Sequence, residues 1–130
     1  MMREEKPNEI QSFRDLNAWK EAHQLAVMTY SITKVYPKEE IFGIVNQMRR
    51  SAVSIPSNIA EGFSRISRKE KIQFYTIALG SLSELQSQFL LSIDIGFLAK
   101  EQHGIIERQT ILVSKLLNGL IKSLRASSFA

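Results

Sequence analysis

The sequence predicts an all-α protein, in the form of an antiparallel up-down-up-down four-helix bundle that makes one domain over residues 1–130. Apolar residues recur at steps of three and four along four long segments, a spacing that puts them on one side of a helix, and no segment alternates as a strand does. The six glycines and three prolines leave few places to turn the chain. Long helices joined by short connections favour antiparallel neighbours.

The first helix is expected at residues 15–36, because Asp15 can accept hydrogen bonds from the free amides of the first turn and Pro37 ends the segment. Its apolar residues form two rows on different sides. One row is Leu16, Trp19, His23, Ala26 and Tyr30, and the other is Ala18, Leu25, Met28, Ile32 and Val35. A helix that is apolar on two sides must bury both. We therefore expect one row inside the bundle and the other against a neighbour or another subunit.

The second helix is expected at residues 39–62, with Glu39–Glu40 beside the positive end of the helix dipole and Gly62 at its exit. The apolar rhythm of this segment passes through Pro56 without a change of phase. A proline inside a helix removes one backbone hydrogen bond and does not require the helix to end. We therefore predict one helix with a bend near Ala52.

The third and fourth helices have clear boundaries in the sequence. Ser67 and Glu70 have the spacing of a capping box, which predicts a helix over residues 67–96 with Gly96 as its stop. The fourth helix is expected at residues 100–126, where apolar residues again recur at steps of three and four and a cation lies near the C-terminus.

Several classes of site are excluded by residue content and spacing. The chain has no cysteine, which excludes disulfides, thiolate zinc sites, iron–sulfur clusters and a cysteine nucleophile. His23 and His103 each follow a glutamate by two residues, and side chains two apart on a helix point roughly 200° apart, so neither pair can hold one metal ion. We expect His23 in a packing row and His103 on a solvated first turn. No nucleotide-binding or catalytic motif occurs, so we expect no cofactor and no enzyme.

Hydropathy and the absence of cysteine predict a cytoplasmic protein with no membrane role. Residues 1–11 contain no apolar stretch of signal-peptide length, and no uncharged apolar run reaches the roughly 18 residues that a membrane span needs. Seventeen Lys and Arg against 13 Asp and Glu give a formal net charge of +4. This modest excess favours phosphate-bearing partners without establishing them.

A row of polar residues lies beside the apolar row of the second predicted helix. Its members recur at steps of three or four, and two residues of the third helix are suited to face them; the set is Gln47, Arg50, Ser54, Asn58, Glu61, Ser81 and Glu84. The row is either a ligand or catalytic groove between helices, or a structural hydrogen-bond network or solvated face, and we favour the structural interpretation. We expect an ion pair between Arg50 and Glu84. An enzyme that used Arg50, Asn58, Glu61 and Glu84 would need an open pocket around them.

A cluster of cations occupies the turn between the second and third predicted helices. It consists of Arg65, Arg68, Lys69 and Lys71 against the single anion Glu70. In a monomer such a cluster is usually solvated surface, whereas in a symmetric assembly we predict that these cations contact nucleic-acid phosphates. Lys20, Lys34 and Arg49 are further candidates. Symmetric assembly would multiply the cluster around an axis, so that several weak phosphate contacts act as one multivalent site.

Four stretches of the chain resemble one protein family. They are Gln47–Gly62, which includes the adjacent arginines and the Asn-Ile-Ala-Glu-Gly end, together with Phe13–Lys20, Tyr36–Gly43 and Ala78–Leu85. The chain is identified from them, over about residues 12 to 98, as resembling the four-helix-bundle proteins encoded in intervening sequences of bacterial 23S ribosomal RNA genes.

The resemblance implies a closed four-helix bundle that assembles as a homopentamer around a central opening. The family is also similar to the accessory proteins of diversity-generating retroelements, basic pentamers that bind nucleic acid and a reverse transcriptase. By that analogy the chain is expected to be a non-enzymatic, homo-oligomeric protein that binds structured RNA or DNA. The alternative is a protein-interaction scaffold, for example a partner of a reverse transcriptase, with no direct nucleic-acid role.

Overall fold

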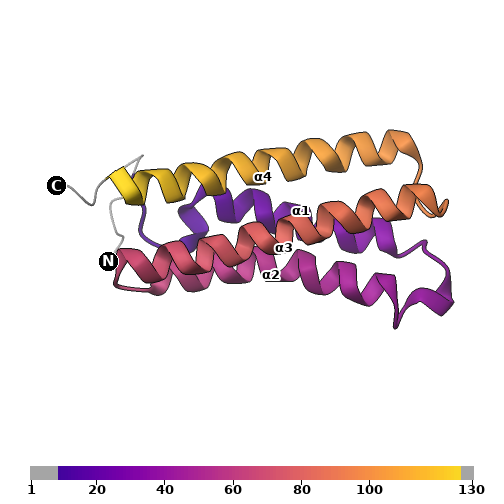
Figure 1. Cartoon of the computed structure of the whole chain (residues 1–130), viewed down its shortest axis with the longest axis horizontal. Coiled ribbons are helices and arrows are strands. Elements are labelled where there is room, and N and C mark those ends of the chain that lie inside the picture. The colour runs from indigo at the N-terminus through magenta and orange to yellow at the C-terminus, as the bar shows by residue number, and fades with distance from the viewer. Residues whose placement is uncertain (1–8, 127–130) are drawn as a thin grey trace, which may run out of the picture.

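The structure is a computed structural model that describes residues 9–126, and these form four long α-helices with two short 3₁₀ turns and no strand. The helices are α1 (Asn17–Thr33), α2 (Ile44–Ser64), α3 (Arg68–Asp94) and α4 (Lys100–Ala126), and the turns are η1 (Phe13–Asp15) and η2 (Lys38–Glu40). Consecutive helices run in opposite directions, and α4 closes the bundle against α1 (Figure 1). The predicted all-α up-down-up-down bundle is confirmed.

The first helix is shorter than predicted, and Asp15 is not its N-cap. Ser12 caps η1 instead, because its Oγ accepts a hydrogen bond from the backbone N–H of Arg14 at 3.1 Å, while Asp15 Oδ2 accepts one from the backbone N–H of Ser12 at 3.1 Å. Asp15 therefore closes a capping box from inside the turn. Helix α1 then begins at Asn17 and ends at Thr33, before the predicted limit of residue 36.

The limits of the second helix also differ from the prediction. Glu39 and Glu40 belong to η2, and α2 begins only at Ile44, whose backbone N–H points to Glu40 Oε2 at 3.5 Å. Gly62 is not the exit, because α2 continues to Ser64. The helix runs through Pro56 without a break, as predicted. The bend near Ala52 stays a prediction.

The predicted ends of the last two helices are confirmed more closely. Ser67 Oγ accepts a hydrogen bond from the backbone N–H of Glu70 at 3.1 Å and so caps α3. The helix ends at Asp94, and Gly96 follows with a φ of 86°, the left-handed conformation that favours glycine after a helix. Helix α4 has the predicted bounds.

The core face of α1 lies between the two predicted rows and includes threonines that an apolar pattern does not count. Thr29 and Thr33 are buried, and each hydroxyl donates a 2.8 Å hydrogen bond to a carbonyl one turn earlier. The hydroxyls are therefore satisfied inside the helix. Members of both predicted rows are buried beside them, while Tyr30 and Val35 are 41% and 79% exposed. The prediction that one whole row packs inside is thus wrong.

The other three helices turn continuous apolar faces to this core. The largest fully buried side chains come from all four helices and include Leu25, Met48, Ile55, Ile59, Leu82, Leu85, Phe89, Ile106 and Leu117. Among residues 9–126, no helix combines the length and the apolar character needed to cross a membrane.

Candidate functional site

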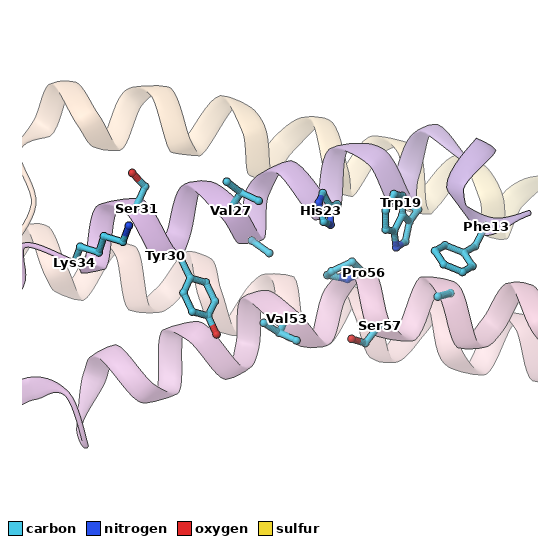
Figure 2. Close-up of a pocket in the computed structure, with 12 residues that line it drawn as sticks. Phe13, Trp19, His23, Val27, Tyr30, Ser31, Lys34, Val53, Pro56 and Ser57 are labelled. Atoms are coloured by element: carbon cyan, nitrogen blue, oxygen red, sulfur yellow. The ribbon is translucent and has the colours of Figure 1, made fainter.

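An open apolar groove runs along the side of the bundle between α1 and α2, and we name it the α1–α2 groove. It consists of two hollows of about 680 and 710 Å³ that share Tyr30 and Val53. Figure 2 shows Trp19, His23 and Tyr30 of α1 pointing toward α2, with Val53 and Pro56 on the opposite wall. The groove is apolar along most of its length, although it lies on the surface.

One end of the groove is built from stacked rings. The 3₁₀ turn η1 carries Phe13, whose ring meets Trp19 edge-on with centroids 5.1 Å apart, and Trp19 stacks on His23 at 4.8 Å. His23 therefore does belong to a packing row, as predicted, although its side chain stays exposed. The other end of the groove holds Ile41 and Phe42, which are 53% and 93% exposed.

The polar residues that line the groove include cations and no carboxylate. Lys34, Arg49 and Arg50 line it. Arg49 is partly committed, because its Nε donates to Thr33 Oγ1 at 3.0 Å and its guanidinium lies 4.7 Å from the centre of the Tyr30 ring. Lys34 is exposed at the rim.

The predicted phosphate-contacting cations lie together at one end of the bundle, but they are not equally available. Arg68 and Lys69 are exposed and have no ion-pair partner among residues 9–126. Arg65 pairs with Glu61 and stacks on the ring of Phe74, 4.7 Å from its centre.

Lys71 is used inside the fold. Its Nζ donates to the carbonyl oxygens of Phe63 at 2.7 Å and Gly62 at 3.4 Å, and it lies 5.3 Å from the centre of the Phe63 ring. A cation at the last carbonyls of a helix satisfies acceptors that have no partner within the helix and interacts well with the helix dipole. Lys71 therefore caps α2 from α3, a role that the sequence pattern did not indicate.

The bundle is electrostatically divided along its length. The start of α1, the end of α2, the start of α3 and the end of α4 lie at the same end (Figure 1), which we name the basic end. Of the described residues, this half comprises residues 9–25, 55–81 and 114–126 and carries nine Lys and Arg against five Asp and Glu. The other half comprises residues 26–54 and 82–113 and carries six of each; we name it the balanced half and its end the balanced end. The whole excess of positive charge therefore lies at the basic end.

The three additional cations predicted to contact phosphate do not join this cluster as a group. Lys20 lies in the basic half and is exposed. Lys34 and Arg49 lie in the other half, beside the α1–α2 groove. The structure thus separates them from the turn at Arg65–Lys71.

Part of the predicted polar row forms a hydrogen-bond network between α2 and α3. Ser54 Oγ and Ser81 Oγ are 2.8 Å apart, and Asn58 Nδ2 donates to the carbonyl oxygen and to Oγ of Ser54 at 2.8 and 2.9 Å. Glu61 is directed elsewhere, to Arg65. The bond between Ser54 and Ser81 joins the two helices at one height, while Asn58 holds the Ser54 hydroxyl from within α2, which agrees with the structural interpretation.

The remaining members of the row line a shallow hollow beside that network. Its volume is about 340 Å³, and Gln47, Arg50 and Glu84 line it. The predicted ion pair between Arg50 and Glu84 is not formed, because the ion pairs among residues 9–126 are Arg65–Glu61 and His103–Glu107. Both side chains are exposed, and an ion pair between exposed side chains contributes little to stability.

His103 is not the solvated side chain that was predicted. Its side chain is only 14% exposed, and Nδ1 lies 4.0 Å from Glu107 Oε2. Gln86 on α3 closes the same region by donating to Thr110 Oγ1 at 3.1 Å. The described part of the chain holds no group of three or more His, Asp or Glu side chains placed to bind a metal ion.

Comparison with known proteins places this bundle in a family. No curated protein matches the sequence. A solved structure from Bacteroides thetaiotaomicron, described as a protein of unknown function from the S23 ribosomal protein family, is 26% identical and superimposes with a TM-score of 0.73. The match covers 80% of this chain and 97% of that one. The profile of the 23S rRNA-intervening sequence proteins matches residues 14–119. The chain therefore belongs to the 23S rRNA-intervening sequence protein family.

Proposed function

We propose that this protein is a non-enzymatic homo-oligomer, a pentamer as the family resemblance implies, that binds structured nucleic acid through the basic end of its bundle. The observation that carries the proposal is the segregation of charge, with nine cations against five anions in one half and balance in the other. Phosphate backbones bind such a surface with little regard to sequence.

Arg68 and Lys69 are the residues that we assign to direct phosphate contact. Both are exposed at the start of α3 and are not paired to another described residue. Arg65 and Lys71 are engaged within the fold, so they add to the local potential more than to direct contacts. Since two free cations make a weak site, the proposal needs several copies that act together.

The test combines solution mass with binding to an RNA hairpin over a series of salt concentrations. We expect the solution mass of a closed ring, which is five chains as the family resemblance implies, and an affinity for the RNA hairpin that falls steeply as the salt concentration rises. Arg68→Ala with Lys69→Ala should weaken binding and flatten the plot of log affinity against log salt by about 1 to 2 for each copy that contacts the RNA. The matched control is Lys100→Ala with Arg108→Ala, two exposed cations of the balanced half. Equal effects of the two pairs would refute the assignment.

The α1–α2 groove favours a second candidate, a scaffold that binds another protein and makes no nucleic-acid contact. An open apolar groove with rings at one end fits an amphipathic helix of a partner such as a reverse transcriptase. Binding of that partner should survive nuclease treatment and change little with salt. Loss of the complex on nuclease treatment would exclude this candidate.

A further inference from the structure

The outer side of α3 carries features that nothing within the described chain explains. Ile77 and Leu91 are 51% and 50% exposed there. Gly80 lies between them, and a Cβ at that position would meet nothing within 4 Å. Glycine inside a helix is less favourable than alanine, and no neighbour in the fold requires it here. With Glu84, these residues form what we name the α3 strip.

Charge on the α3 strip is complementary to charge in the α1–α2 groove. From residue 72 to the end of α3 the only charged residues are Glu84 and Asp94, and both are exposed. The groove has Lys34 and Arg49 among its lining residues and no carboxylate. One surface of the chain is thus apolar and acidic, and another is apolar and basic.

The two surfaces lie on neighbouring sides of the bundle and border each other at Arg50 and Ser54, which line both the groove and the shallow hollow beside Glu84, but the strip cannot pack into the groove of its own chain. Ser81 contacts Ser54 of α2, and Ile77 and Glu84 lie about one turn on either side of Ser81, so the strip borders the seam between α2 and α3. The groove lies on the other side of α2, and among the described residues no Cα atom of α1 lies within 8 Å of one of α3. Packing of the strip into the groove must therefore join two copies.

We propose that the α3 strip of one copy packs into the α1–α2 groove of the next, with all copies in the same orientation. This inference rests on the self-association in the proposed function and names the surfaces that produce it. Because the two surfaces differ, the contact is head-to-tail and repeats until a ring closes. Neighbouring sides of a four-helix bundle face directions about 90° apart. Two contact surfaces on one copy that face directions about 90° apart close a ring of about four copies, and an angle of about 108° closes a ring of about five.

Such a ring has two consequences for charge. All basic ends come to lie on one face, which provides the multivalent surface that the proposed nucleic-acid site needs. All copies also lie at the same height, so residues at equal heights meet across the interface. Glu84 lies three residues toward the balanced end from Ser81, which contacts Ser54, and Lys34 follows Thr33, which bonds Arg49 five residues before Ser54. Their heights therefore differ by less than about one turn, which a lysine side chain can span, and we pair them across the interface.

Cross-linking tests the pairing directly, because the chain contains no cysteine of its own. Ile77 precedes Ser81 by four residues, a rise of about 6 Å, which brings it to the height of Asn58 on α2. That position is within one turn of Pro56 and Ser57, the residues on the wall opposite His23. In the His23→Cys, Ile77→Cys double variant we expect oxidation to give a ladder of linked chains that ends at the closed ring. Each single variant should give no cross-link, because the two surfaces differ.

The outcomes separate this inference from the proposed function. An oligomeric wild-type protein whose double variant gives no ladder, or a single variant that cross-links to itself, would overturn the pairing while leaving self-association intact. A monomeric wild-type protein at the same concentration would overturn both. If the double variant gives the ladder but the wild-type protein does not bind the RNA hairpin, only the nucleic-acid proposal would be overturned.

Charge reversal gives a second measurement that does not depend on oxidation. Glu84→Lys and Lys34→Glu should each raise the concentration at which the ring dissociates by at least about tenfold, and the double variant should restore much of the loss. Ile77→Lys should also disrupt the ring, whereas Ile105→Lys on α4, at a position 55% exposed, is the matched control. Disruption by Ile105→Lys and not by Ile77→Lys would contradict the inference.

Discussion

Substitution of Gly62 by alanine gives a sharp test of how α2 and α3 pack. A Cβ on Gly62 would lie 2.8 Å from Tyr75 Cε1 and 3.0 Å from both Tyr75 Cδ1 and Phe74 Cβ. The Tyr75 ring is only 3% exposed and cannot swing aside freely, and Phe74 Cβ is fixed by the backbone of α3. Gly62 therefore serves the close approach of two helices, whereas the sequence had indicated a helix exit.

The expected magnitude follows from two opposing effects. Alanine in place of glycine inside a helix gains up to about 1 kcal/mol, whereas forcing a methyl group into a packed core costs about 1 to 3 kcal/mol. We expect Gly62→Ala to lower the free energy of unfolding by about 1 to 2 kcal/mol.

The matched control is Gly119→Ala on α4, where a Cβ would meet nothing within 4 Å and the substitution should raise stability by about 0.5 to 1 kcal/mol. Urea unfolding followed by circular dichroism measures both. If Gly62→Ala proved as stable as Gly119→Ala, the packing argument would be refuted.

Three further predictions concern single side chains. Lys71→Met should lower the free energy of unfolding by about 0.5 to 1.5 kcal/mol, because the hydrogen bond to the Phe63 carbonyl is lost. Lys69→Met should leave the free energy of unfolding unchanged and reduce the salt dependence of RNA binding. The reverse pattern would exchange the roles of the two lysines. Phe89→Ala should cost about 3 to 5 kcal/mol in urea unfolding, because the ring is 1% exposed in the core. Burial raises the pKa of Tyr75 above its usual 10.0, so the folded state holds the phenol proton more tightly. Stability should therefore be unaffected by this group below about pH 10 and fall as the pH rises further, and Tyr75→Phe should reduce that fall.

Local signals in the sequence predicted the helices whose ends depend on local chemistry. Ser67 with Glu70, and Gly96 after the last turn, mark the limits of α3 within two residues. The error at α1 has the same origin, because an aspartate suits the N-cap as well as the third position of a capping box. Ser12 decides between them by capping η1, and the helix proper begins after that turn.

The roles of the polar residues could not be read from spacing, because they depend on how helices meet. A count of charges treats Lys69 and Lys71 alike, yet one is exposed and the other caps α2. The threonines at 29 and 33 look polar in a pattern, but each satisfies its hydroxyl within α1 and packs in the core. Such positions become visible only when the neighbouring helix is placed.

The segregation of charge shows most clearly what topology adds to composition. A net charge of +4 over the whole chain is modest, and the cations responsible are spread over the two ends and the middle of the sequence. Because the helices alternate in direction, residues 9–25, 55–81 and 114–126 come together at one end of the bundle (Figure 1), and the entire excess comes with them. A bundle of the same composition whose helices carried these cations at their opposite ends would have the same net charge, but this end of the bundle would not be basic. The basic end is therefore a property of the fold, and a ring of equally oriented copies would turn that small local excess into a broad positive face.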